Sequence, residues 1–171
     1  MRDKVTEANN AVLNIRGIRE QTTERMAKVS PRRKAEIQKL ADNLLQPLSG
    51  VEEAVYQVKN RSNQDPLNYP IRLNNKIAAL MGVIESADHR PTDQTYQVFD
   101  ELTKELDAQL QKLAQTVKTE MPRVNAALQR EKIAPVDANA KPAPPPPPTP
   151  QQLQKLLQEL DELMEIMKKQ W

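Results

Sequence analysis

Residues 93–132, DQTYQVFDELTKELDAQLQKLAQTVKTEMPRVNAALQREK, form the stretch of sequence that decides the fold. Apolar side chains recur along it in alternating steps of three and four residues, which is the spacing of one face of a helix. Charged residues such as Glu101 and Lys104 occupy the other side. The pattern predicts one long amphipathic helix that Thr92 caps and that Pro122 can kink. Its apolar stripe consists of Tyr96, Phe99, Leu102, Leu106, Leu110, Leu113, Val117, Met121, Val124 and Leu128.

Two segments nearer the N-terminus repeat this periodicity. The first covers residues 2–29, and Arg19 occupies one position of its stripe. The other stripe residues there are Val5, Ala8, Val12, Ile15, Thr22, Met26 and Val29. The second covers residues 31–60, and Ser30 before Pro31 is typical of a helix N-terminus. Its stripe consists of Ile37, Ala41, Leu44, Leu48, Val51, Val55 and Val58.

Proline interrupts the second of these segments at position 47. Because proline has no amide N–H and crowds the preceding turn, we expect a kink or a break near Gln46. Ser49, with Glu52 three residues later, is expected to cap a restarted helix. A shorter helix is predicted over residues 71–86, after a loop, with Leu73, Ile77, Leu80, Met81 and Ile84 on one side.

Together these stripes predict an all-α protein. Residues 1–132 are expected to form an antiparallel bundle of three to four long helices, which cross at roughly 20° as in coiled coils. Aromatic residues are only 3% of the 171 residues, so the core must be aliphatic. The oligomeric state is left open, because a bundle of this kind can also form a homo-oligomer through the same stripes.

The C-terminal part differs in composition. Residues 133–150 are proline-rich and are expected to be a linker, with a polyproline II spacer that is also a candidate ligand for aromatic-lined grooves. Residues 151–171 are predicted to be an amphipathic helix. The candidate face of this helix consists of Leu153, Leu157, Leu160, Met164, Met167 and Trp171. Two interpretations stay open: the helix closes the bundle of its own chain, or it docks on another chain.

The segment between the second and third predicted helices is the least generic part of the sequence. Its polar and turn-forming side chains suit a docking surface, but we favour a loop that Arg72, Asn74 and Asn75 hold between two helices by hydrogen bonds. The residues concerned are Asp65, Pro66, Asn68, Tyr69, Pro70, Arg72, Asn74 and Asn75.

Composition excludes several kinds of site. The absence of cysteine excludes disulfides, thiol nucleophiles and zinc–thiolate centres. A single histidine, His89, cannot supply a histidine-rich metal site, and three glycines leave no room for a glycine-rich phosphate loop. The net charge is only +2, and Arg32-Arg33-Lys34 is the only basic cluster, so we expect no nucleic-acid surface.

Catalysis and membrane insertion are not predicted either. Carboxylates are spread over helix surfaces, and no pair is placed across an expected cleft. No apolar run approaches the ~20 residues of a membrane span, and the first ten residues lack the apolar region of a signal peptide. We therefore expect a protein that is not an enzyme, with no cofactor and no metal.

Residues 65–80, DPLNYPIRLNNKIAAL, and 82–102, GVIESADHRPTDQTYQVFDEL, resemble the C-terminal helical region of bacterial sortilin-like, BNR/Asp-box repeat proteins of the glycosyl hydrolase type. The earlier RDKVTEANNAVLNIR and VEEAVYQVKNRSNQ are similar to the same region, so the resemblance covers roughly residues 2–130. The helix at 151–171 is not part of it.

The resemblance implies an accessory role. In such proteins a β-propeller comes first, and any hydrolase site would lie there, so no residue of this chain is expected to be catalytic. The resemblance also implies that the parent proteins are exported. We expect a non-catalytic helical domain that supports a propeller or mediates assembly. The alternative is a free-standing helical adaptor that binds a protein partner through residues 151–171 or the polyproline segment.

Overall fold

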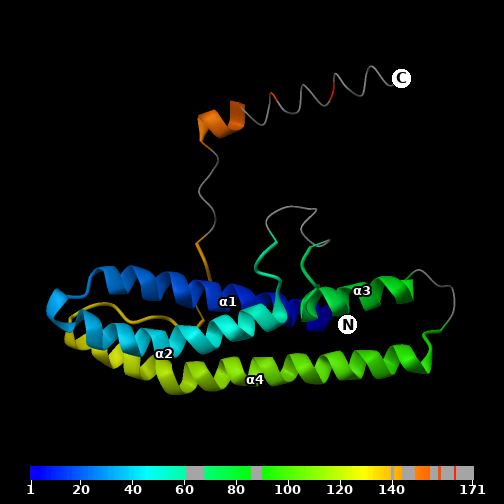
Figure 1. The fold of residues 1–171 in the computed structure, drawn as a ribbon, viewed down its shortest axis with the longest axis horizontal. Helices are drawn as coiled ribbons and strands as arrows, with labels where there is room; N and C mark the ends of the chain where they lie inside the picture. Colours follow the sequence, from blue (N-terminus) through cyan, green and yellow to red (C-terminus); the bar gives the residue numbers. More distant parts are fainter. Residues whose placement is uncertain are drawn as a thin grey trace.

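The computed structural model describes residues 1–60, 68–85, 90–139, 141–143 and 149–154, together with Gln158 and Met164. Within this part of the chain the protein is all-helical, as predicted. The helices are α1 (Arg2–Ala27), α2 (Pro31–Val55), α3 (Leu73–Glu85) and α4 (Asp93–Arg130). Figure 1 shows α1 and α2 as an antiparallel pair, with α4 running back along α2 and with α3 beside the N-terminal part of α4.

The heptad stripes form the core. In α1, Ala8, Val12 and Ile15 are buried, and Thr22 is buried with its hydroxyl donating to the carbonyl of Ile18. The predicted N-terminus of α2 is confirmed, with Ser30 at the N-cap position and Pro31 in the first turn. The Ser30 side chain makes no capping hydrogen bond there. The remaining fully buried aliphatic side chains include Ile37, Leu44, Leu48, Val51, Val55, Ile77, Leu106 and Leu128.

The predicted break in α2 is wrong. The helix runs without interruption from Pro31 to Val55 and contains Pro47 in its interior. Ser49 does not cap a new helix, because its hydroxyl donates to the carbonyl of Leu45, four residues back in the same helix. Packing against α4 on one side and α1 on the other keeps the helix continuous despite the missing donor.

The C-terminal end of α2 also comes earlier than expected. Tyr56 adopts an extended conformation, with φ −131° and ψ 144°, and its amide donates to the carbonyl of Glu52. Val58, which the periodicity placed on the buried stripe, is therefore 39% exposed. A helical period says where side chains point but not where the backbone leaves the helix.

The capping prediction for α4 is confirmed. The hydroxyl of Thr92 accepts a hydrogen bond from the amide of Thr95 at 3.4 Å. Pro122 lies inside the helix, which continues to Arg130. No helix in the described part of the chain is both long enough and apolar enough to cross a membrane.

Residues 131–139 and 141–143, which we call the strap, turn back from the end of α4 and lie against the bundle. Lys132 makes the reversal with a φ of 58°. The side chain of Asn125 then donates to the carbonyl of Val136 at 3.0 Å and accepts from its amide at 2.8 Å. Val136 is only 3% exposed. The predicted start of the linker at residue 133 therefore lies within the packed unit.

The strap also contacts α1. The amide of Asp137 donates to Gln21, and the side chain of Asn14 donates to the carbonyl of Ala138. At its far end the amide of Ala143 donates to the carboxylate of Glu20 at 3.0 Å. The chain therefore leaves the bundle beside the middle of α1 rather than at the end of α4, as Figure 1 shows.

Candidate functional site

Three helices surround the core over most of the bundle, but only two continue at one end. The amino group of Lys4 bonds to the carboxylate of Asp107 at 2.8 Å. The side chain of Asn74 donates to Asn9 at 3.4 Å. These contacts place the first turns of α1 against one side of both α3 and α4. Beyond them the two helices extend further, as Figure 1 shows, with no third helix among the described residues.

Helical spacing identifies the residues on the sides of α3 and α4 that α1 would face if it extended further in this direction. On α3, positions four and seven residues after Asn74 share its side of the helix. On α4, positions four and eleven residues before Asp107 share its side. Of these four, Thr103 has a hydroxyl oxygen that is already buried. The other three, with Phe99 next to them on the apolar stripe, form what we call the open slot: Ala78, Met81, Tyr96 and Phe99.

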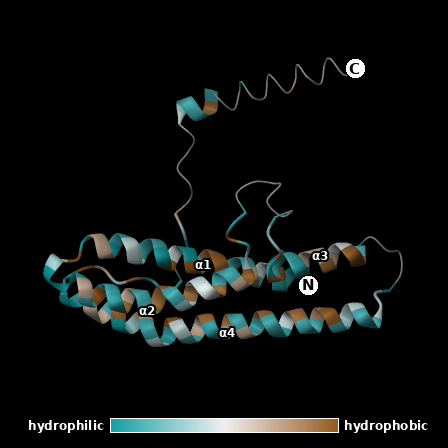
Figure 2. Ribbon diagram, viewed as in Figure 1, coloured by the Kyte–Doolittle hydropathy of each residue, from teal (hydrophilic) through white to brown (hydrophobic). Residues whose placement is uncertain are grey.

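Burial falls along this end of the molecule. Ile77, three residues after Asn74, and Leu106, next to Asp107, are 0% exposed. Met81 and Phe99 are only partly buried, and Tyr96 is 45% exposed. Figure 2 shows that hydrophobic positions nevertheless continue along both helices in this region. The open slot is thus the continuation of the core stripe without the helix that would cover it.

The surroundings of the open slot are acidic. Residues 93–107 contain five carboxylates and one lysine, a net charge of −4. In the first turn of α1, the hydrogen bond from Lys4 to Asp107 and, to a lesser extent, its bond to Glu7 raise the pKa of the Lys4 amino group. The negative side chains on α4 therefore attract cations at this end.

Part of the loop motif singled out in the sequence takes part in hydrogen bonds between the described segments. Asn74 is 8% exposed and bonds to Asn9, and its carboxamide oxygen accepts from the amide of Asn75. The carbonyl of Pro70 accepts from Gln57, which is 4% exposed. These contacts agree with a loop that holds two helices together.

The other motif residues are more open. The ring of Tyr69 lies 5.6 Å from the amino group of Lys59, and Asn68 and Asn75 are exposed. Arg72 is half-buried at the start of α3, where its carbonyl accepts from the amide of Lys76. Asp65 and Pro66 lie outside the described residues.

The predicted face of the C-terminal helix is described at two of its positions. Leu153 is 46% exposed and Met164 is 42% exposed, and both are helical. Leu157, Leu160, Met167 and Trp171 lie outside the described residues.

A buried carboxylate that the sequence analysis missed lies between α1 and α2. Glu52 is 3% exposed and bonds to Arg16 at 2.7 Å and to Arg19 at 2.8 Å. Arg19 also donates to the hydroxyl of Ser49, and Arg16 lies 5.0 Å from the ring of Tyr56. Arg19, a charged residue at a stripe position of the first segment, was the signal in the sequence. A pocket of about 390 Å³ adjoins this network, but its arginines are already bound to Glu52.

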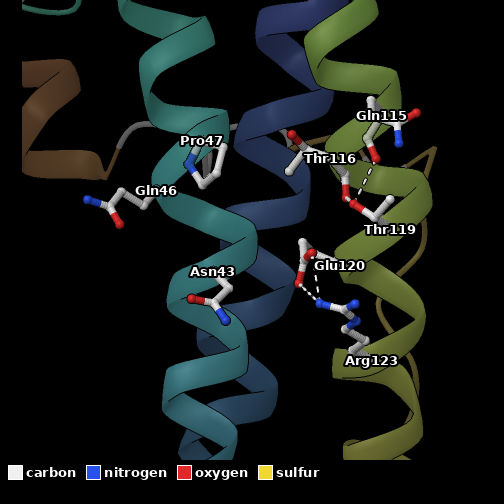
Figure 3. A pocket seen from close by; sticks show the side chains of 8 residues that line it. All are labelled: Asn43, Gln46, Pro47, Gln115, Thr116, Thr119, Glu120 and Arg123. Atoms are coloured by element: carbon white, nitrogen blue, oxygen red, sulfur yellow. Dashed lines mark hydrogen bonds and ion pairs between the residues drawn. The ribbon is translucent and has the colours of Figure 1, made fainter.

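A second pocket, of about 350 Å³, lies between α2 and α4 around Pro47 (Figure 3). Its lining is polar. Glu120 and Arg123 pair with each other at 3.1 Å, and the hydroxyl of Thr119 donates to the carbonyl of Gln115. The remaining lining residues are Asn43, Gln46, Pro47 and Thr116. The amides can exchange hydrogen bonds with water or a small polar molecule, but the charged groups satisfy each other.

The described residues contain no group of three histidine or carboxylate side chains placed to hold a metal ion. The pKa of Glu24 is lowered by its hydrogen bond to Lys28 and by the charges of Arg25 and Lys28. This is the behaviour of a surface ion pair and not of a general acid, whose pKa would be raised.

Comparison with known proteins adds no relative. No protein-family profile, no curated protein and no solved structure matches this chain.

Proposed function

We propose that this chain is a non-catalytic helical assembly module and that its open slot receives an amphipathic helix. The observation that carries the proposal is the fall in burial along α3 and α4, from 0% exposure at Leu106 to 45% at Tyr96. An apolar groove between two helices is the receptor in helix-in-groove recognition. A helix there would complete the three-helix cross-section that the rest of the bundle already has.

Burial of the slot side chains beneath a helix would contribute favourably to the free energy of binding. Full burial of a large apolar side chain contributes about 1.5–3 kcal/mol, and the part-exposed Met81, Tyr96 and Phe99 would each contribute a fraction of this. The incoming helix also needs little rearrangement of the receptor, since both walls are formed helices.

The sequence resemblance proposes a setting for this module. In a sortilin-like BNR-repeat protein the neighbour would be a propeller in the same polypeptide. An antibody raised against residues 51–130 tests this on a denaturing blot of the source cells. A band several times heavier than 19.5 kDa supports the setting, and a band near 19.5 kDa contradicts it.

Peptide titration tests the slot itself. The protein is the whole chain carrying Leu157→Asp and Leu160→Asp, so that its own C-terminal helix cannot compete. A labelled synthetic peptide with a leucine heptad stripe is titrated by fluorescence anisotropy. We expect saturable binding that Tyr96→Asp weakens about tenfold or more, because a charge would then be buried against the peptide.

The matched control is Gln97→Asp, which adds the same charge at an exposed position one residue along α4. It should leave the affinity unchanged. Absence of peptide binding, or equal weakening by both substitutions, would rule out the slot as a helix receptor.

A second candidate function is an adaptor that binds a partner through its C-terminal helix. The exposure of Leu153 and Met164 favours it. Hydrogen exchange separates the two cases. Amides of residues 153–167 that exchange much faster than those of residues 99–117 support the adaptor, and equal protection contradicts it.

A further inference from the structure

We propose that the open slot selects a basic helix of another protein, with lysine or arginine side chains beside its apolar stripe. This inference rests on the proposed function, because it specifies the chemistry of the helix that the slot receives. Two features of the described residues carry it. Carboxylates lie on the slot sides of both helices, and a lysine of α1 already pairs with a carboxylate of the same series on α4.

Helical spacing places three carboxylates beside the slot. On α4, Asp100 lies seven residues and Asp93 fourteen residues before Asp107, so the three share one side of the helix. On α3, Glu85 lies four residues after Met81 and shares its side. Glu85, Asp93 and Asp100 are exposed, and none of them forms an ion pair within the described part of the chain.

The pair between Lys4 and Asp107 shows how a cation meets this side of α4. In the first turn of α1 the amino group of Lys4 lies 2.8 Å from the carboxylate of Asp107. Seven residues of a helix rise by about 10.5 Å, so Asp100 and Asp93 repeat the position of Asp107 one and two steps further along α4. A helix that continues the line of α1 meets both carboxylates if its cations recur every seven residues, which is also the period of its apolar stripe.

The charge balance of the slot favours a cationic occupant. Lys104, four residues after Asp100, is the only cation among residues 93–107, so the three carboxylates outnumber it. The last turn of α3 contains no basic residue, and the free carbonyl groups of a helix C-terminus add negative charge beside Glu85. A basic helix is therefore attracted to the slot and an acidic one is repelled from it.

Neither the C-terminal segment nor a second copy of the chain supplies this charge. Residues 151–171 contain three lysines and four carboxylates, a net charge of −1. Two copies with their slots face to face would bring Asp93 and Asp100 of one protomer against the same carboxylates of the other, and like charges repel. A helix of another protein therefore fits the slot better than either.

Synthetic peptides test the charge selection on the whole chain with Leu157→Asp and Leu160→Asp. All share one leucine heptad stripe. The first carries lysines and the second carries glutamates at the positions that flank the stripe, and the third carries the same lysines on the opposite side of the helix. We expect the first to bind about tenfold more tightly than the other two in about 50 mM salt, and the preference should shrink in about 0.5 M salt. Fluorescence anisotropy measures the affinities.

Two double variants locate the charges responsible. Asp93→Asn with Asp100→Asn should weaken binding of the first peptide about fivefold or more and should not weaken binding of the glutamate peptide. The matched control is Glu101→Gln with Glu105→Gln, which removes the same charge from other sides of α4. It should change the affinity of the first peptide by less than about twofold, because charges that face away are screened by salt.

Each other outcome has a definite meaning. Equal affinities of the lysine and glutamate peptides, or equal losses in the two double variants, would overturn the inference and leave the receptor function intact. Tighter binding of a peptide of residues 151–171 would overturn it, since the C-terminal segment would then be the occupant. Binding that weakens as the protein concentration rises would also overturn it in favour of a second copy. Failure of every peptide to bind would remove the proposed function itself.

Discussion

Glu52 of α2 links this helix to α1 by ion pairs. Its carboxylate is bound by two arginines of α1 and is nearly excluded from water. Arg16 and Arg19 keep 39% and 38% of their side chains exposed, so they retain hydration that a fully buried pair would lose. The network therefore fixes the register of two helices without the full desolvation cost of buried cations.

Replacing this carboxylate should destabilise the fold. We expect Glu52→Ala to lower the free energy of unfolding by about 1.5–3 kcal/mol, because two charge-assisted hydrogen bonds are lost. Urea denaturation measures the change. Glu53→Ala is the matched control, since Glu53 is the next residue and is exposed. Equal effects of the two substitutions would show that the network contributes nothing to stability.

At the scale of single elements, α2 is held in a helical conformation against the preference of one of its own residues. Pro47 cannot donate to the carbonyl of Asn43, and a proline in a helix interior costs about 3 kcal/mol relative to alanine. Burial of Leu44, Leu48 and Val51 at 0% exposure offsets this cost. The continuity of α2 is therefore a tertiary effect.

Pro47→Ala should stabilise the protein. The restored hydrogen bond and the removed ring clash outweigh the entropy that proline takes from the unfolded chain. We expect a gain of about 1–3 kcal/mol, which corresponds to a rise in Tm of roughly 2–4 °C per kcal/mol. Calorimetry measures this shift. A lower Tm for the variant would mean that packing of the proline ring is worth more than the missing hydrogen bond.

The helices could be predicted from the sequence because their signal is local. Ile15, Leu44 and Leu106 are buried where a repeat of three and four residues puts them. The strap could not, because the side chain of Asn125 recognises the backbone of Val136 across a chain reversal. Such a contact leaves no periodicity. The loop at Pro70 and Asn74 lies between these cases, since its composition predicted hydrogen bonds but not their partners.

The open slot shows a further limit of the same reasoning. Phe99 and Leu106 occupy equivalent positions of one stripe, yet only Leu106 is fully buried. The first turn of α1 contacts α4 at Asp107, next to Leu106 and eight residues from Phe99. Where one helix begins beside another is a property of two helices and not of one. Periodicity predicted the apolar face of α4 but not the length of it that a neighbour covers.

At the scale of the whole molecule, Lys4 and Asp107 join α1 to α4. The raised pKa of Lys4 means that the folded state favours its charged form. The stabilisation is therefore fully present below the ordinary lysine pKa of 10.5 and is lost as the pH rises through the higher folded value.

Comparison with Asp107→Asn across pH tests this link. Between about pH 6 and pH 9 the unmodified protein should be more stable by about 0.2–1 kcal/mol, the range for an ion pair near the surface. Above pH 10.5 the difference should shrink as Lys4 loses its proton. Chemical denaturation at each pH measures it. A difference that stays constant through this range would assign the effect to another group.

The strap has a mechanical consequence for the whole molecule. Because the chain leaves the bundle at Glu20, tension applied to the C-terminus acts across the strap and not along the axis of α4. The hydrogen bonds of Ala143, Ala138 and Val136 would then open one after another, as a zipper does, before the helices carry any load. In an optical trap this would be a small extension at low force ahead of the main unfolding event. The strap would open first and let the C-terminal part of the chain extend while the helical core stays folded.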